Sequence, residues 1–187
     1  MALSDWELRP DDKNYYEDRA SYVRQGDLFC SIPQGYPWPP DAIAHEEGER
    51  TFLSGPFDSG FGMLTTPTCS MLAQGEASGY AHAVRSLAPV ISLQKLVEHG
   101  AIKTGSVDDL RVRDHLVNYF YVPAIEEAGL PESLALIYAP VTIHHDYLDD
   151  RRIAQLSEEA AIHLKYKLCA HSTGELFSHD DFEDKIN

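Results

Sequence analysis

The densest group of potential metal ligands in this sequence is a pair of histidines followed by three aspartates. His144, His145 and Asp146 are consecutive, and Asp149 and Asp150 come shortly after them. Imidazole and carboxylate groups are common ligands of zinc, iron and manganese. Because adjacent side chains of a strand point to opposite faces, His144 and His145 are not expected to share one ion, whereas His144 and Asp146 can converge if a turn begins at Asp146. The favoured interpretation is a solvated exit turn that holds no cofactor.

A second candidate for chemistry is a turn rich in hydroxyl and thiol groups, residues 65–70, which follows an apolar run. Thr66, Thr68 and Cys69 are its candidate ligand-binding residues, and Cys69 is also a candidate nucleophile that a nearby histidine could activate. No glycine-rich nucleophile elbow surrounds this cysteine. The hydroxyls are therefore expected mainly to satisfy the backbone amides of their own turn.

An aromatic and proline-rich segment, residues 34–58, contains Tyr36 and Trp38. A stretch of this length without periodicity is uncommon inside a compact domain. Stacked aromatic rings beside prolines can bind a peptide or another ligand, which makes Tyr36 and Trp38 candidate ligand-binding residues. The alternatives are a lid packed onto the domain and a short hairpin around residues 51–53.

Five apolar runs are expected to form the strands that position these groups. They cover residues 25–33, 60–68, 80–93, 118–123 and 134–145. The first three runs are expected to be neighbours in one curved sheet. Pro89 leaves open whether the third run is one strand or two, and Pro140 places the last run at an edge or at a bulge.

A final helix is marked by its two ends. Ser157 is a suitable N-cap, acidic residues follow it at the positive end of the helix dipole, and Gly174 is placed to end the helix. Apolar residues recur between these ends at helical spacing. The pattern predicts that Leu164 and Leu168 are buried and that Lys165 is exposed.

One domain is expected for a chain of 187 residues. It runs from residue 25 to residue 174, after a polar arm at 1–24 and before an acidic tail at 175–187. Three short helices are expected besides the final one, at residues 15–22, 93–99 and 107–117. The predicted fold is α+β, with a small, mostly antiparallel β-barrel, a long proline-rich insertion and a carboxyl-terminal helix.

Four short motifs follow one another in an informative order: Gly26-Asp27, residues 63–66, residues 88–92 and residues 152–157. Together they resemble the opening, the two following strands and the turn before the last helix of the MazF/PemK toxin family. The resemblance covers roughly residues 22–172, with large insertions at 34–58 and 100–118. It implies an SH3-like barrel that carries a carboxyl-terminal helix.

The same resemblance implies catalytic residues, from which this chain departs. The ribonucleases of the family use an arginine just before the second strand and a serine or threonine after the third, and the arginine would stabilise charge on the transferring phosphate. Ser92 matches the hydroxyl, but residues 54–62 contain no arginine. Arg50 or Arg152 would have to replace it. Cys69, Ser92 and Arg152 are thus the candidate catalytic residues, with no reaction assigned.

Charge and composition limit the partners and the location. The chain carries 30 acidic and 15 basic residues, a net charge of −15. Nucleic-acid binders present basic surfaces, so nucleic acid is disfavoured and a protein or small-molecule ligand is expected.

Three cysteines without a C-x-x-C pair indicate no zinc ribbon. The amino terminus lacks a secretion signal and no apolar run reaches the roughly 20 residues of a membrane helix, which favours a cytoplasmic, membrane-free protein. A homodimer is left open.

These observations favour a non-nucleolytic binding or regulatory protein on a MazF/PemK-like barrel. Two alternatives stay open. The first is a toxin-type endoribonuclease. The second is a small hydrolase or metal-dependent enzyme that uses the Thr65–Cys69 turn or the pair of His144 and Asp146.

Overall fold

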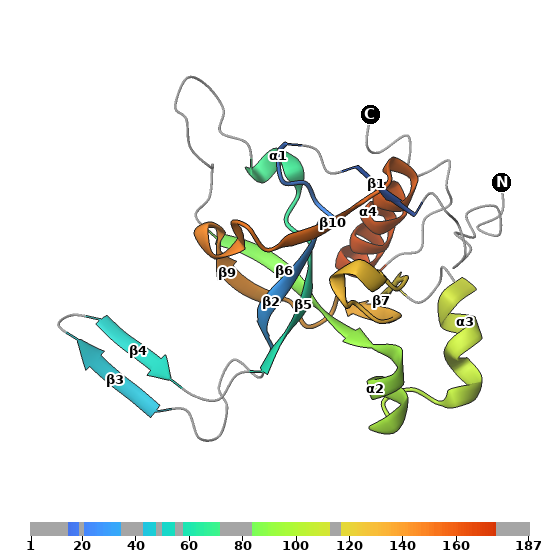
Figure 1. Ribbon diagram of the computed structural model, residues 1–187, viewed down its shortest axis with the longest axis horizontal. Coiled ribbons are helices and arrows are strands. Elements are labelled where there is room, and N and C mark those ends of the chain that lie inside the picture. The colour runs from blue at the N-terminus through green and yellow to red at the C-terminus, as the bar shows by residue number, and fades with distance from the viewer. Residues whose placement is uncertain are drawn as a thin grey trace.

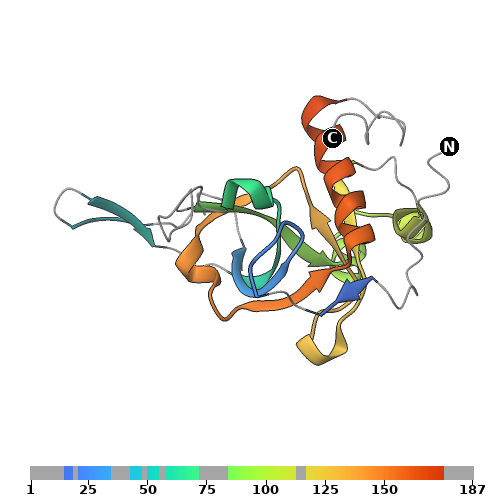
Figure 2. The same ribbon diagram turned by 90° about the horizontal axis from the view of Figure 1, so that it is seen from above.

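The sheet of this protein is an antiparallel array of eight strands that curls into a half-barrel (Figures 1 and 2). The computed structural model describes residues 15–18, 21–34, 43–47, 50–54, 58–71, 84–112 and 117–174. The strands are β1 (Tyr16–Glu17), β2 (Leu28–Gln34), β5 (Asp58–Leu64), β6 (Val84–Ser92), β7 (Tyr119–Val122), β8 (Ser133–Leu136), β9 (Val141–His144) and β10 (Arg152–Leu156). Their order is β1-β10-β2-β5-β6-β8-β7, and β9 also pairs with β6. The predicted α+β class and antiparallel sheet are confirmed.

The remaining elements are helices, short 3₁₀ turns and one separate hairpin. The helices are α1 (Thr68–Met71), α2 (Leu93–Glu98), α3 (Val107–Val112) and α4 (Glu158–Thr173), and the 3₁₀ turns are η2 (Thr104–Ser106), η3 (Glu126–Ala128) and η4 (His145–Leu148). The hairpin of β3 (Ile43–Glu47) and β4 (Arg50–Ser54) extends away from the half-barrel (Figure 1). It contains the hairpin expected around residues 51–53, whereas Tyr36 and Trp38 lie outside the described residues.

The three runs predicted to be neighbours form β2, β5 and β6, which lie side by side. Leu28 faces Met63 across one pair of strands, and Met63 faces Ala88 across the next. β6 is a single strand that contains Pro89. Its amino-terminal half pairs with β9 and its carboxyl-terminal half with β8, and neither of these strands pairs with Pro89. Proline has no N–H to donate, and it is tolerated here because it lies between the stretch of β6 that pairs with β9 and the stretch that pairs with β8.

The strand expected at 60–68 ends at Leu64, before α1, and two other predicted elements are wrong in type or in extent. The run at 134–145 is two strands, β8 and β9, with a turn at residues 137–139 between them. Pro140 cannot donate to a ladder, and the break lets both strands pair with β6. Where a helix was expected at 15–22, the described residues contain the short strand β1, Tyr16–Glu17, which pairs with β10. The preceding residue, Tyr15, is buried and donates a hydrogen bond to the carbonyl of Tyr121. Helix propensity depends on nearby residues only, so it could not reveal this long-range contact.

The main core lies between one face of the sheet and α4 (Figure 2). Ser157 caps this helix by accepting the N–H of Ala160 at 3.3 Å, and Gly174 ends it with a φ of 70°. Leu164 is buried and Lys165 is exposed, as predicted. Leu168 is only half-buried, at the margin of the core. A second apolar cluster covers the other face of the sheet: Phe29, Ile32, Leu64, Met71, Leu87 and Leu148.

Candidate functional site

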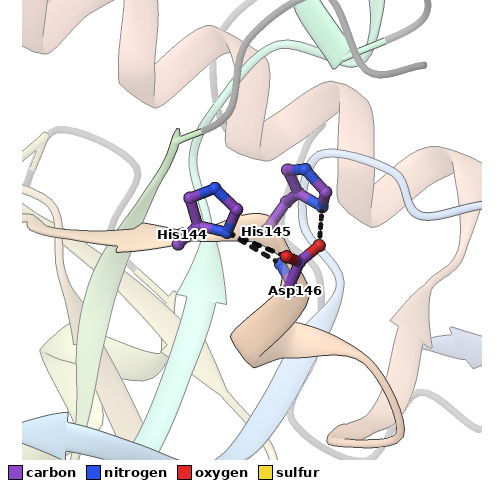
Figure 3. Close-up of side chains that lie close together, drawn as sticks. All are labelled: His144, His145 and Asp146. Carbon is purple, nitrogen blue, oxygen red and sulfur yellow. Dashed lines mark hydrogen bonds and ion pairs between the residues drawn. The ribbon is translucent and has the colours of Figure 1, made fainter.

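The two histidines and the aspartate predicted from the sequence converge at the corner where β9 leads into η4 (Figure 3). The imidazole rings of His144 and His145 are stacked, with centroids 4.6 Å apart. Nδ1 of His144 lies 3.4 Å from Oδ2 of Asp146, and Nδ1 of His145 lies 2.9 Å from Oδ1 of the same carboxylate. The expectation that the two side chains point to opposite faces is therefore wrong, and the geometry does not prevent them from sharing one ion. The strand ends at His144, so the alternation of faces does not extend to His145.

This corner is held by contacts on both sides. β9 pairs with β6 in a register that places His144 opposite Val84. At the far end of η4, the buried side chain of Leu148 packs into the second apolar cluster. The hydroxyl of Tyr147 donates to the carbonyl of Ser31 at 3.0 Å, and Ser31 lies in the irregular, bulged part of β2. The backbone of the corner is thus fixed, with the side chains of His144 and Asp146 exposed and that of His145 half-buried.

The side chains of the corner form a set that can coordinate a metal ion. One ligand atom from each of the three residues lies within 4.8 Å of the others. The side chain of His145 is 23% exposed, and those of His144 and Asp146 are 53% and 70% exposed. Two imidazoles and one carboxylate are the protein ligands of several catalytic zinc and non-haem iron sites, where the other coordination positions stay open.

The hydroxyl-rich turn after β5 makes structural contacts with neighbouring segments. Thr66 accepts the main-chain N–H of Ser86 at 2.7 Å, and Thr65 donates to the carbonyl of Ser86 at 3.0 Å. Thr68 accepts the N–H of Gln25 at 3.1 Å. The hydroxyls therefore bond to backbone groups of β6 and of the segment before β2, and not to those of their own turn as expected. The side chain of Cys69 lies outside the described part of the structure.

Ser92 and Arg152 both hold structural positions. Ser92 is the N-cap of α2 and accepts the N–H of Lys95 at 3.1 Å. Arg152 pairs with the buried Asp27 at 3.0 Å and donates to the carbonyl of Tyr22 at 2.7 Å. Burial raises the pKa of the Asp27 carboxyl, an effect that hydrogen bonds from a main-chain N–H and from Arg152 oppose.

The separation between these two residues follows from the register of the sheet. Arg152 faces Phe29, Phe29 faces Gly62, and Gly62 faces Pro89. Three strand spacings amount to about 14 Å across the sheet, and Ser92 lies three residues beyond Pro89, about 10 Å along the strand. The structure therefore does not bring the arginine and the serine together.

A charged cluster between α3 and β8 was not predicted from the sequence. Nε and Nη2 of Arg111 donate to the two carboxylate oxygens of Glu132 at 2.6 and 2.7 Å, and the hydroxyl of Tyr121 donates to Oε1 at 2.5 Å. These contacts hold the pKa of Glu132 below its usual range. The residues lie far apart in the sequence and no motif links them, so no local pattern could have identified the cluster.

Comparisons with known proteins assign no family to the chain. No protein-family model matches it, and a comparison with curated protein sequences finds no match. The MazF/PemK resemblance thus stays a prediction. Within the described residues, no helix combines the length and apolar character needed to cross a membrane.

Proposed function

We propose that this chain is a non-nucleolytic binding or regulatory protein whose partner is a protein or a small molecule. The observation that carries the proposal is the placement of Ser92 and Arg152. A toxin-type nuclease on this chain would need Ser92 to act on a phosphate together with a replacement arginine, Arg50 or Arg152. Ser92 instead caps a helix, and Arg152 pairs with a buried carboxylate. The carboxylate of such a pair offsets the field of the arginine and occupies its donors, which leaves less to stabilise charge in a transition state.

The charge of the whole chain supports the same conclusion. A net charge of −15 opposes the approach of a polyanion, and such repulsion acts over a Debye length of about 8 Å at physiological ionic strength. RNA binding gains most of its affinity from neutralising phosphates with basic side chains. Arg151 is engaged close to its own backbone, since its guanidinium donates to the carbonyl of Tyr147 and lies over the ring of that residue.

The test is incubation of the purified protein with single-stranded RNA of mixed sequence, with and without divalent metal. We expect no cleavage. Ser92→Ala is compared with Ser92→Asn, because asparagine keeps the helix cap while it removes the hydroxyl. Specific cleavage that is lost in both variants, with their folding intact, would overturn the proposal in favour of a toxin-type nuclease.

The binding half of the proposal is tested by a thermal-shift screen against a small-molecule library. A ligand that binds only the folded state raises the melting temperature by mass action. Tyr36→Ala and Trp38→Ala are the variants for comparison, because these aromatic residues are the ligand-binding candidates of the proline-rich segment. A shift seen in the wild type and lost in these variants would assign binding to that segment.

A further inference from the structure

We infer that the corner between β9 and η4 binds a divalent first-row transition-metal ion through His144, His145 and Asp146. The inference concerns a site that the proposed function does not use, and it holds whether or not the protein cleaves RNA. It rests on the convergence of the three side chains, on the anchoring of the backbone that carries them and on the chemistry of their ligand atoms (Figure 3).

The spacing of the ligand atoms suits a small cation. Zinc lies about 2.0–2.1 Å from nitrogen and carboxylate ligands, so neighbouring ligands of a tetrahedral site are about 3.3 Å apart. Nδ1 of His144 lies 3.4 Å from the nearer oxygen of Asp146, and Nδ1 of His145 lies 2.9 Å from the other oxygen. Small side-chain rotations bring all three ligands to coordination distance, because the atoms already lie within 4.8 Å of one another.

The orientation of His144 favours coordination through Nδ1. The main-chain N–H of Asp146 donates to this atom at 3.4 Å, so its lone pair points toward the backbone of Asp146, and an oxygen of the Asp146 carboxylate lies 3.4 Å from the same atom. A metal ion would replace a long and therefore weak hydrogen bond. The side chains of His144 and Asp146 are 53% and 70% exposed, so an ion can reach this position from solvent. Binding thus breaks no strong interaction at this position.

The backbone around the ligands needs little ordering when an ion binds. The pairing of β9 with β6 fixes the residue before the corner, and Leu148 and Tyr147 fix the turn after it. Sites that are formed before binding lose less conformational entropy when the ligand arrives. We therefore expect the ion to bind the folded chain with little change in the fold.

The ligand set selects the class of ion. Imidazole nitrogen suits zinc, copper, nickel and iron, whereas magnesium and calcium prefer sites made only of oxygen. With three protein ligands, the remaining coordination positions are left for water or for a group of a partner molecule.

The experiment is a titration of chelator-treated, full-length protein with Zn²⁺ in competition with a chromogenic zinc indicator. We expect the wild type to bind one equivalent that His145→Asn and Asp146→Asn each weaken by more than about tenfold, since the loss of outer-shell partners alone costs 10–100-fold. Asp149→Asn is the matched control for charge and His99→Asn for the loss of an imidazole. Both are expected to bind within about twofold of the wild type. A hundredfold excess of Mg²⁺ is expected not to displace the zinc.

Folding of each variant is checked by circular dichroism and by its melting temperature without metal. As a second measurement, Zn²⁺ should raise the melting temperature of the wild type and of Asp149→Asn but not that of Asp146→Asn. Binding and stabilisation that are unchanged in both His145→Asn and Asp146→Asn would place the ion elsewhere and overturn the inference. The absence of any zinc binding by the wild type would overturn it as well.

Discussion

Replacing Arg152 with methionine removes the cation that faces the buried carboxylate of Asp27. In the folded chain, Oδ2 of Asp27 accepts hydrogen bonds from Nη1 of Arg152 at 3.0 Å and from the main-chain N–H of Arg24 at 2.9 Å. Within the described part of the chain, the other oxygen, Oδ1, has no hydrogen-bond partner. The side chain of Asp27 is 1% exposed, so water does not compensate for the lost arginine.

The expected loss of stability is about 3 kcal/mol at pH 7. Breaking a buried ion pair by removing one partner typically costs 3–5 kcal/mol. The lower value applies because the N–H of Arg24 remains and because Arg152 is itself partly exposed, at 18%. Replacing both charges, in Asp27→Asn/Arg152→Met, removes the uncompensated carboxylate. This double variant should therefore lose roughly 2 kcal/mol less than the sum of the two single variants.

The penalty should also depend on pH. Burial already raises the pKa of Asp27, and the loss of Arg152 raises it further. A carboxyl with a raised pKa binds more protons in the folded state than in the unfolded state, so stability falls as pH rises from the unfolded value toward the folded value. We expect the destabilisation of Arg152→Met to be smallest near pH 4 and to increase toward pH 7.

Urea denaturation at several pH values, followed by circular dichroism, measures these free energies. Arg152→Lys is the control, since it keeps a cation but loses the planar guanidinium. A cost below about 1 kcal/mol for Arg152→Met at pH 7, or single-variant costs that simply add in the double variant, would show that the pair is not the buried interaction described above.

Two further predictions concern packing. Leu164→Ala should cost about 2–5 kcal/mol in denaturant melts, and Leu168→Ala roughly half as much, because only Leu164 is fully buried; equal costs would contradict the placement of α4. Gly26 has a φ of +95°, and an added Cβ would lie 2.8 Å from Leu156 Cδ1, whereas Gly129 has a φ of +65° and open space around it. Gly129→Ala should therefore cost about 1–2 kcal/mol for the backbone alone, and Gly26→Ala should cost more because of the clash.

The parts of the fold that the sequence predicted are those specified by neighbouring residues. Ser157 and Gly174 mark the ends of α4 directly, through a side-chain cap and a left-handed φ. The apolar runs that form β2, β5 and β6 are neighbours in the sheet. Strands that follow one another in the sequence usually lie side by side, so their order along the chain was enough to predict this pairing. Local information was sufficient for these elements.

The elements that were mispredicted depend on contacts far along the chain. β1 is held by the buried Tyr15, whose hydroxyl bonds to a carbonyl 106 residues away, and by pairing with β10. β8 and β9 form two strands instead of one because each pairs with a different stretch of β6. The ion pair of Arg111 with Glu132 is likewise a tertiary contact. A local sequence pattern does not show which distant residues come into contact, so it could not predict these elements.

The candidate metal site shows where a correct local rule was applied beyond its range. Alternation of faces holds for residues 141–144, which form β9, and it would separate His144 from His145 if the strand continued. In a 3₁₀ turn, successive side chains differ by about 120° around the axis instead of 180°. η4 begins at His145, so the carboxylate of Asp146 comes to lie within reach of both imidazoles. The same break at Pro140 that divides the predicted strand leaves β9 only four residues long. Pro140 precedes the start of β9, whereas the histidines lie at its end, so the beginning of η4 at His145 determines where the corner lies.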